Sequence, residues 1–324
     1  MKIKRKYYVI GGANIDLLGK SNDSLNLSDS NPGVISMSFG GVARNIAENL
    51  ARMKEEVVFL SVFGDDGLGR QCLEHLNSLS IDTSFSVIVK HRSSSTYMAI
   101  ANAEGEMVSA IADMGILEEL NQTHLDRFLK QINRHDILVM DTNLSESMID
   151  YITSACKGII AVDPISSKKA VKIIPFLSRV SVFKPNRIEA EVVCGFAIED
   201  DESLMKALLH LRSYKIKHVI ISLGSQGGVV ANDKGIYRYR TKEFDIISVT
   251  GAGDAFLASY VANLGESVEE NIEAAVSASM IACCSEHTVH PKMSIELITD
   301  FRNRNAVMIE KRWDINESDL EADI

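Results

Sequence analysis

Residues 248–256 read Ser-Val-Thr-Gly-Ala-Gly-Asp-Ala-Phe, the most informative stretch of the chain. The apolar run at 244–249 is typical of a strand, and the run at 255–264 is typical of a helix. Gly251 and Gly253 lack a Cβ atom, so the backbone can turn sharply here and approach a ligand closely. The stretch therefore predicts a tight turn between a strand and a helix.

Asp254 stands at the start of the predicted helix. Backbone N–H groups at a helix N-terminus attract anions, and in phosphoryl transfer they can stabilise the charge on the moving phosphoryl group. A carboxylate at this place can accept a proton from an attacking hydroxyl. Aspartate is also a favoured helix cap, so the turn alone leaves both interpretations of Asp254 open.

Apolar runs alternate with helix-like segments along most of the chain. In segment 42–53, for example, apolar residues recur at the spacing of one helical face. Such alternation predicts βαβ units around a parallel sheet that is covered on both faces. Strands are expected at 7–10, 57–62, 137–140, 158–162, 180–183 and 219–222, and further helices at 204–211 and 274–282.

Two regions interrupt this alternation. Residues 17–39 are polar and rich in turn-forming residues, and residues 87–114 alternate around an Asn-Ala-Glu-Gly turn. Both are typical of antiparallel β additions outside the main sheet. Two such insertions near the start of an α/β chain predict a small flap over the binding site.

Composition limits the partners and the compartment. The chain has 324 residues, of which 46% are hydrophobic, enough for a large core. Its net charge of -10 argues against a nucleic acid or an anionic membrane as partner. No apolar run is long enough for a transmembrane helix or a signal peptide. The five cysteines are irregularly spaced, so we expect reduced thiols in a cytoplasmic protein.

Two further motifs accompany the glycine turn. Residues 40–47 read Gly-Gly-Val-Ala-Arg-Asn-Ile-Ala, and residues 184–191 read Lys-Pro-Asn-Arg-Ile-Glu-Ala-Glu. In order and spacing, the three motifs resemble the signatures of the ribokinase-like (pfkB) family of sugar and nucleoside kinases. The resemblance covers nearly the whole chain.

The resemblance implies an α/β fold, a ribokinase-like three-layer sandwich with a central, mostly parallel sheet and a small β-sheet lid. The expected boundaries are an α/β core with the ATP site at 1–16, 40–86 and 115–310, a β lid over the sugar site at 17–39 and 87–114, and a C-terminal tail at 311–324.

The family's mechanism implies roles for the glycine turn. Asp254 would be the catalytic base that takes a proton from a sugar hydroxyl. The backbone N–H groups of Gly251, Ala252 and Gly253 would hold the phosphoryl group on its way from ATP. Positioning and electrostatics would supply most of the acceleration.

Sugar-binding residues are expected near the first strand and the first motif. Asn14 and Asp16 follow the first strand, at the carboxyl edge where open α/β sheets bind ligands. A capped turn is the alternative for this pair. The resemblance implies that Gly40 and Gly41 turn against the sugar and that Asn45 hydrogen-bonds its hydroxyls, since an amide offers both a donor and an acceptor.

ATP and Mg²⁺ are the implied cosubstrate and metal. Glu189 resembles the residue that organises magnesium near the phosphates, often through water. A surface helix start is its alternative, and Met280 can equally be a core residue. The residues expected at the nucleotide are Asn186, Ser222, Gly224, Gly227, Thr250, Met280 and Cys283.

A finer resemblance concerns the acceptor. Segments of the two lid insertions resemble the pseudouridine kinases within the family, which implies phosphorylation of the 5′-hydroxyl of pseudouridine. Asp29, Asn31, Thr96 and Asp113 would then meet the ribose or the uracil edge, where unpaired polar groups reject analogues. Turn chemistry alone also accounts for Asp29 and Asn31.

Ser248 departs from the family pattern. Many members carry an acid at this position, which supports a monovalent cation beside the anion site. Serine cannot supply that charge, so activation by potassium is doubtful. Lids of this family often pair between subunits, which implies a homodimer through the lid.

Other functions stay open at this point. They include a kinase for ribose, adenosine or fructose, and a nucleoside- or sugar-binding protein that has lost catalysis. The intact glycine turn and Asp254 argue against the second. A nicotinamide oxidoreductase is disfavoured, because Gly11-Gly12 lacks the later glycine of the dinucleotide fingerprint.

Overall fold

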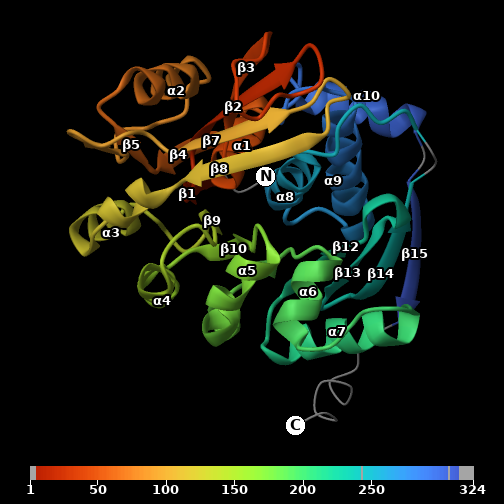
Figure 1. Cartoon of the computed structure of the whole chain (residues 1–324). Helices are drawn as coiled ribbons and strands as arrows, with labels where there is room; N and C mark the ends of the chain where they lie inside the picture. The colour runs from red at the N-terminus through yellow and green to blue at the C-terminus, as the bar shows by residue number, and fades with distance from the viewer. Residues whose placement is uncertain (1–4, 242–243, 306, 314–324) are drawn as a thin grey trace.

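A nine-stranded sheet forms the centre of the part of the chain that the computed structural model describes, residues 5–241, 244–305 and 307–313 (Figure 1). Its strands are β1 (Lys6–Ile10), β4 (Glu56–Leu60), β9 (Ile137–Asp141), β10 (Ile159–Asp163), β11 (Val182–Phe183), β12 (His218–Ser222), β13 (Gly228–Asn232), β14 (Gly235–Arg240) and β15 (Met308–Trp313). They lie in the order β15-β14-β13-β12-β11-β10-β9-β1-β4. The pairs from β12 to β4 are parallel, and those from β12 to β15 are antiparallel.

Helices cover both faces of this sheet and produce three layers, as predicted. In α1 (Val42–Arg52), Ala43, Ile46, Ala47 and Leu50 are fully buried, as the helical spacing predicted. The same face carries α2 (Gly67–Ser78), α8 (Ala252–Ala262), α9 (Val268–Cys283) and α10 (Ile295–Arg304). The other face carries η1 (Gly115–Glu119), α3 (Gln122–Leu129), α4 (Glu146–Ala155), α5 (Ser167–Ala170), η2 (Val171–Arg179), α6 (Arg187–Cys194) and α7 (Asp201–Ser213). A short turn, η3 (Gly224–Gln226), links β12 to β13.

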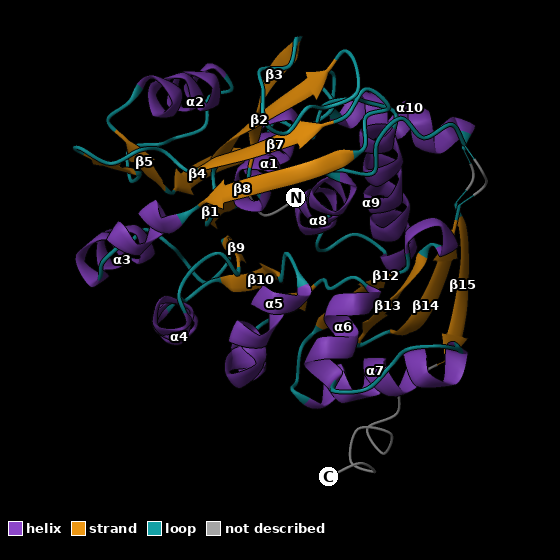
Figure 2. Cartoon of the chain, viewed as in Figure 1, coloured by secondary structure: helices purple, strands orange, loops and turns teal. Residues whose placement is uncertain are grey.

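A smaller, four-stranded sheet forms the predicted lid. It contains β2 (Asn14–Ser21), β3 (Gly33–Gly40), β7 (Thr96–Ala101) and β8 (Met107–Asp113) in the order β3-β2-β7-β8. Figure 2 shows these strands at the top of the view, set apart from β12–β15. The two hairpins are antiparallel, but β2 pairs with β7 in parallel. That parallel pair differs from a wholly antiparallel flap, because the chain returns to the core between the two hairpins.

The run at 244–249 is not a strand, which corrects the prediction. The backbone N–H groups of Ile247 and Ser248 donate to the carbonyl oxygen of Cys283, at 2.9 and 3.2 Å. The segment is therefore held by the end of α9 rather than by a strand edge. Its apolar side chains are partly exposed, and Val249 is 71% exposed.

One boundary of the lid and one boundary of the C-terminal tail also differ from those predicted from the sequence. β6 (Val87–Val89) pairs in parallel with β5 (Val62–Gly64) in a separate two-stranded sheet, not in the lid. Residues 311–313, predicted as tail, belong to β15, which pairs with the edge of β14 opposite to β13. The rest of that tail, 314–324, lies outside the described residues. Within the described ranges, no helix is long and apolar enough to cross a membrane.

Candidate active site

The glycine turn leads directly into α8. Gly251 is the N-cap, with a left-handed φ of 81°, and a Cβ atom there would lie 1.8 Å from the carbonyl oxygen of Thr288. Only glycine fits such a position. No side chain within the described residues caps this helix start. The Ala252 N–H makes a long hydrogen bond of 3.3 Å to the carbonyl oxygen of Val249. The N-terminus of a helix is nevertheless a place where backbone N–H groups favour an anion.

Asp254 lies in the first turn of α8 and is 7% exposed. The Asn45 amide Nδ2 donates a hydrogen bond to its Oδ2 at 2.7 Å, which joins the first motif to the glycine turn. Burial, and then the nearby Asp163 carboxylate, raise the pKa of Asp254 to about 7. A carboxylate with a pKa near neutrality is well suited to act as a general base.

Lys184 is a buried cation that the sequence analysis did not assign to the site. Its Nζ lies 3.1 Å from Asp163 Oδ2, and a Cβ atom on Gly253 would lie 3.1 Å from the same Nζ. Burial lowers the pKa of Lys184, but Asp163, Glu189 and Asp254 together raise it above the ordinary value. A positive charge therefore lies next to the glycine turn. The sequence does carry a signal for this role, because Lys184 directly follows a short buried strand.

Asn14 and Asp16 point to one face of β2, at the base of the lid. The Asn14 amide donates to Asp16 Oδ1, and burial raises the pKa of Asp16. A Cβ atom on Gly40 would lie 2.3 Å from Asp16 Oδ2. Gly40 therefore leaves space in front of the carboxylate, where a hydroxyl-bearing ligand could approach.

Gly41 and Asp141 fix the start of α1. Gly41 has φ 98°, and a Cβ atom there would lie 2.4 Å from the carbonyl oxygen of Gly12. Asp141 is fully buried at the end of β9 and accepts from the backbone N–H groups of Gly12 (2.9 Å) and Ala43 (3.1 Å). Sequence reasoning missed Asp141, although an acid at the end of a buried strand is a signal.

Thr96 and Asp113 lie near the base of the lid but on its other face. They are cross-strand neighbours, and Thr96 pairs with Ile15. Because side chains alternate along a strand, Thr96 and Asp113 point away from the face of Asp16. Tyr97 pairs directly with Asp16 and shares its face, which the sequence alone did not indicate.

Asp29 and Asn31 are not brought to this site. Their loop joins the ends of β2 and β3 that are farthest from the Asn14–Gly40 pair, about 20 Å along the hairpin. Asn31 Oδ1 accepts from the backbone N–H of Asn26 at 2.7 Å, and Asp29 Oδ1 accepts from that of Ser30 at 2.7 Å. Both side chains stabilise the turn, which was the alternative interpretation.

A cavity of about 450 Å³ extends from the glycine turn. Six of the residues expected at the nucleotide line it: Asn186, Ser222, Gly224, Gly227, Met280 and Cys283. Thr250 is exposed and does not. Its lining combines Lys184, Ala252 and Gly253 with several aromatic and aliphatic side chains. Members that the sequence did not indicate are Tyr239, Thr241, Phe244, Ile246, Val249 and Phe256.

Asn186 and Glu189 form a capping box at the start of α6. The Asn186 side chain accepts from Glu189 N at 3.0 Å, and Glu189 Oε2 accepts from Asn186 N at 2.8 Å. Glu189 is nevertheless buried, and burial followed by Asp163 raises its pKa. Its second carboxylate oxygen and Asp163 are hard donors of the kind that Mg²⁺ prefers, so the residues fit a magnesium site shared with phosphates.

Three features occur together here: a cavity that reaches the start of α8, a buried carboxylate in the first turn of that helix, and a small β-sheet lid. This combination defines a small-molecule kinase of the ribokinase-like fold. The family model for pfkB carbohydrate kinases matches residues 4–294. The chain belongs to the pfkB family of carbohydrate kinases, and it is a phosphotransferase that acts on an alcohol group of a sugar or nucleoside.

Named relatives support this assignment. The chain is 33% identical to the pseudouridine kinase of Escherichia coli, over 91% of this chain and 96% of that protein. It is 27% identical to a ribokinase of Staphylococcus aureus, over 73% and 78%. A solved structure from Clostridium perfringens has a TM-score of 0.87 at 31% identity, covering 96% of this chain and 99% of that one. Arabidopsis thaliana ribokinase, solved with ribose and ATP, has a TM-score of 0.79 at 18% identity, over 93% and 99%, which shows a shared fold.

Proposed function

We propose that this kinase transfers the γ-phosphoryl group of ATP to the 5′-hydroxyl of pseudouridine, giving pseudouridine 5′-phosphate and ADP. The observation that carries the transfer is the buried Asp254 carboxylate, with a pKa of about 7, in the first turn of α8, whose start is capped by no side chain of the described residues. The sequence identity of 33% with E. coli pseudouridine kinase, along 91% of this chain, supports the choice of acceptor.

In the proposed mechanism, the acceptor hydroxyl approaches the glycine turn and gives its proton to Asp254. Asn45 holds Asp254 Oδ2 at 2.7 Å, so the other oxygen can receive the proton. The N–H groups at the start of α8 and the Lys184 ammonium stabilise the negative charge of the transferring group. Mg²⁺, when bound near Glu189, would neutralise the remaining phosphate oxygens.

A substrate panel tests the acceptor. ADP release would be measured with pseudouridine, uridine, adenosine, ribose and fructose. We expect kcat/KM to be highest for pseudouridine. A higher value for ribose, adenosine or fructose would reassign the acceptor within the family. Binding of pseudouridine without ADP release from any acceptor would instead support a protein that has lost catalysis.

The kcat/KM of the reaction should fall at acid pH. Because a general base must be ionised, kcat/KM is expected to rise with pH through an apparent pKa of about 7 and then level off. The measurement is a pH profile under conditions where the enzyme remains folded. A profile that is flat between pH 5 and 8 would remove Asp254 from the role of base.

Asp16→Asn should weaken acceptor binding. Its carboxylate accepts hydroxyl hydrogen bonds in the proposed site, so its loss should raise the acceptor KM about tenfold or more and leave the ATP KM unchanged. Asp29→Asn is the matched control, because Asp29 lies at the far end of the hairpin. Equal effects of the two changes would contradict the placement of the sugar at Asp16.

Potassium should not be required. Ser248 supplies no carboxylate beside the turn, so exchange of K⁺ for a bulky organic cation at constant ionic strength should leave kcat/KM unchanged. The measurement is a cation series at one pH. A steep loss of rate without K⁺ would show that backbone and hydroxyl oxygens suffice for a cation site.

We also propose that the lid mediates a homodimer. The lid face opposite to Asp16 carries apolar side chains that neighbour one another in the strand register: Ile35, Met37, Met98, Ile100 and Ile111. All five are 45–79% exposed, an apolar surface of the kind that protein interfaces cover. Sedimentation of the intact chain and of a Met98→Lys/Ile111→Lys variant would test this, since the variant should be monomeric.

A further inference from the structure

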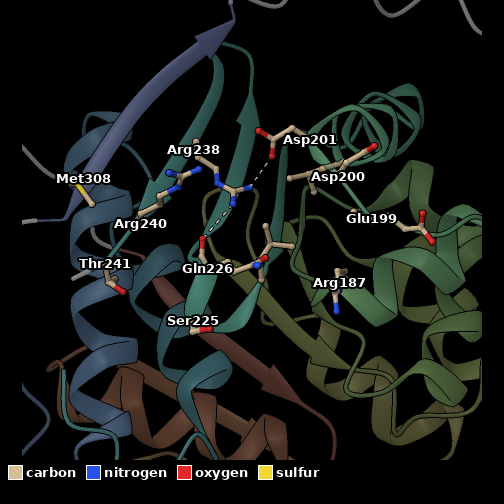
Figure 3. Close-up of a pocket in the computed structure, with 13 residues that line it drawn as sticks. Arg187, Glu199, Asp200, Asp201, Ser225, Gln226, Arg238, Arg240, Thr241 and Met308 are labelled. Carbon is tan, nitrogen blue, oxygen red and sulfur yellow. Dashed lines mark hydrogen bonds and ion pairs between the residues drawn. The ribbon is translucent and has the colours of Figure 1, made fainter. Parts of the chain in front are cut away.

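Charged side chains gather at two places that the mechanism above does not use. In a pocket of about 480 Å³ between β14 and the start of α7, Arg238 lies 3.4 Å from the Gln226 carbonyl oxygen and 4.0 Å from the Asp201 carboxylate (Figure 3). These partners belong to the protein itself, so they give no indication of a ligand. The second place is the start of α1, where Arg44 is buried directly beside Asn45.

Arg44 is only 2% exposed, and its guanidinium group has partners on three segments. Its Nη1 donates to the carboxylate of Glu48, one helical turn further along α1. Its Nη2 lies within hydrogen-bond distance of three oxygens, namely the Phe39 carbonyl oxygen at 2.7 Å, the Thr288 hydroxyl at 3.3 Å, and Oδ1 of Asn45. The guanidinium group is therefore held by α1, by the end of the lid strand β3 and by the segment that follows α9.

The contact with Asn45 decides which end of that amide faces Asp254. A guanidinium group has only donors, whereas an amide has an acceptor at one end and a donor at the other. The Asn45 atom next to Arg44 must therefore be Oδ1, and Nδ2 then points at Asp254, where it donates to Oδ2 at 2.7 Å. Without Arg44, the amide is free to turn over. Its oxygen would then face the carboxylate, and Asp254 would lose the hydrogen bond that holds it.

We propose that Arg44 is a positioning residue of this kinase, which acts through Asn45 by fixing the amide that holds the catalytic base. The inference rests on the proposed role of Asp254 as that base. Burial raises the pKa of Asp254 to about 7, and the Arg44 charge keeps it from rising further. Asp163 and Lys184 also act on this pKa, and the test leaves both unchanged. Loss of Arg44 should therefore misplace the base and raise its pKa.

Arg52 provides a matched control, because it pairs with the same carboxylate. Its Nη2 lies 2.6 Å from Glu48 Oε1, and among the described residues no hydrogen bond joins it to Asn45. In Arg44→Met and in Arg52→Met, Glu48 keeps the other arginine and His75, whose Nε2 lies 3.0 Å away. Both variants should unfold at a lower temperature. Only Arg44→Met should lower kcat, by about 10- to 100-fold, the scale on which misplaced catalytic groups cost rate.

The conservative variant separates charge from geometry. Arg44→Lys keeps the positive charge but has a single nitrogen, which cannot serve Glu48 and Asn45 together as the two guanidinium nitrogens do. The acid limb of the kcat/KM profile should move to higher pH in Arg44→Met and return in Arg44→Lys, while kcat stays low in both. Arg44→Lys keeps a cation beside Glu48, so the kcat test rests on it if Arg44→Met does not fold.

A double variant tests whether Arg44 acts through Asn45. In a protein that already carries Asn45→Ala, Arg44→Met should lower the plateau value of kcat by less than about twofold, because its target is gone. Equal kcat in Arg44→Met and Arg52→Met, or a full further loss in the double variant, would overturn the proposal. If Asp254→Asn kept near-normal turnover, the assignment of the base would fail as well. Low turnover of Asp254→Asn beside normal turnover of Arg44→Met would overturn the role of Arg44 alone.

Discussion

Asp254→Asn is expected to lower kcat by about 10²- to 10⁴-fold, the usual contribution of a positioned general base. The asparagine keeps an oxygen that can accept a hydrogen bond from the Asn45 amide, so the contact between α1 and α8 is retained. The amide cannot take a proton from the acceptor hydroxyl. The KM values for acceptor and ATP should therefore change little. Steady-state kinetics, with Asp29→Asn as control, would measure the difference.

The same substitution should not destabilise the fold. Burial and Asp163 raise the pKa of Asp254 to about 7, above its ordinary value of 3.8. Its contribution to stability is therefore fully present below the unfolded-state pKa and is lost as pH rises through the folded-state pKa. Asparagine stays neutral, so at pH 8 the variant should unfold at the same or a higher temperature. Near-normal turnover in a folded variant would rule out the proposed base.

The main sheet could be predicted because its signal is local. Buried parallel strands produce short apolar runs, and α1 places apolar residues at one helical spacing, so both were visible in the sequence. The run at 244–249 produced the same signal for another reason. Its apolar side chains, such as Ile246 and Val249, line the cavity that extends from the glycine turn. Periodicity alone does not distinguish a ligand wall from a buried strand.

The site was only partly predictable for similar reasons. The motif residues Asn45, Asp254 and Glu189 could be located because glycine turns and helix starts have local signatures. The face of the lid that each residue occupies depends on the parallel pairing of β2 with β7, which joins segments about 80 residues apart. A slip of one position would place Thr96, instead of Tyr97, beside Asp16. Lys184 belongs to the motif at residues 184–191, but its role depends on its own burial and on the acidic side chains around it, which the sequence does not show.

Lys184→Met should lower kcat/KM by about 10²- to 10³-fold, comparable to the loss of one group that stabilises a developing anion. It should also move the acid limb of the pH profile above pH 7, because the lysine charge now holds down the pKa of Asp254. A purely structural role for Lys184 would not move that limb. The pH dependence of kcat/KM for the variant is the measurement.

The stability of this variant sharpens the test. Methionine leaves Asp163, Glu189 and Asp254 without their buried cation, and breaking a buried ion pair costs about 3–5 kcal/mol. Lys184→Met/Asp163→Asn removes both partners of the 3.1 Å pair and should recover most of that stability. Turnover should stay low in the double variant, because the charge next to Gly253 is still absent and because Asp163, one of the two carboxylates that fit Mg²⁺, is lost as well. If activity returned together with stability, Lys184 would only neutralise Asp163, and the phosphoryl group would be held by the helix N-terminus without it.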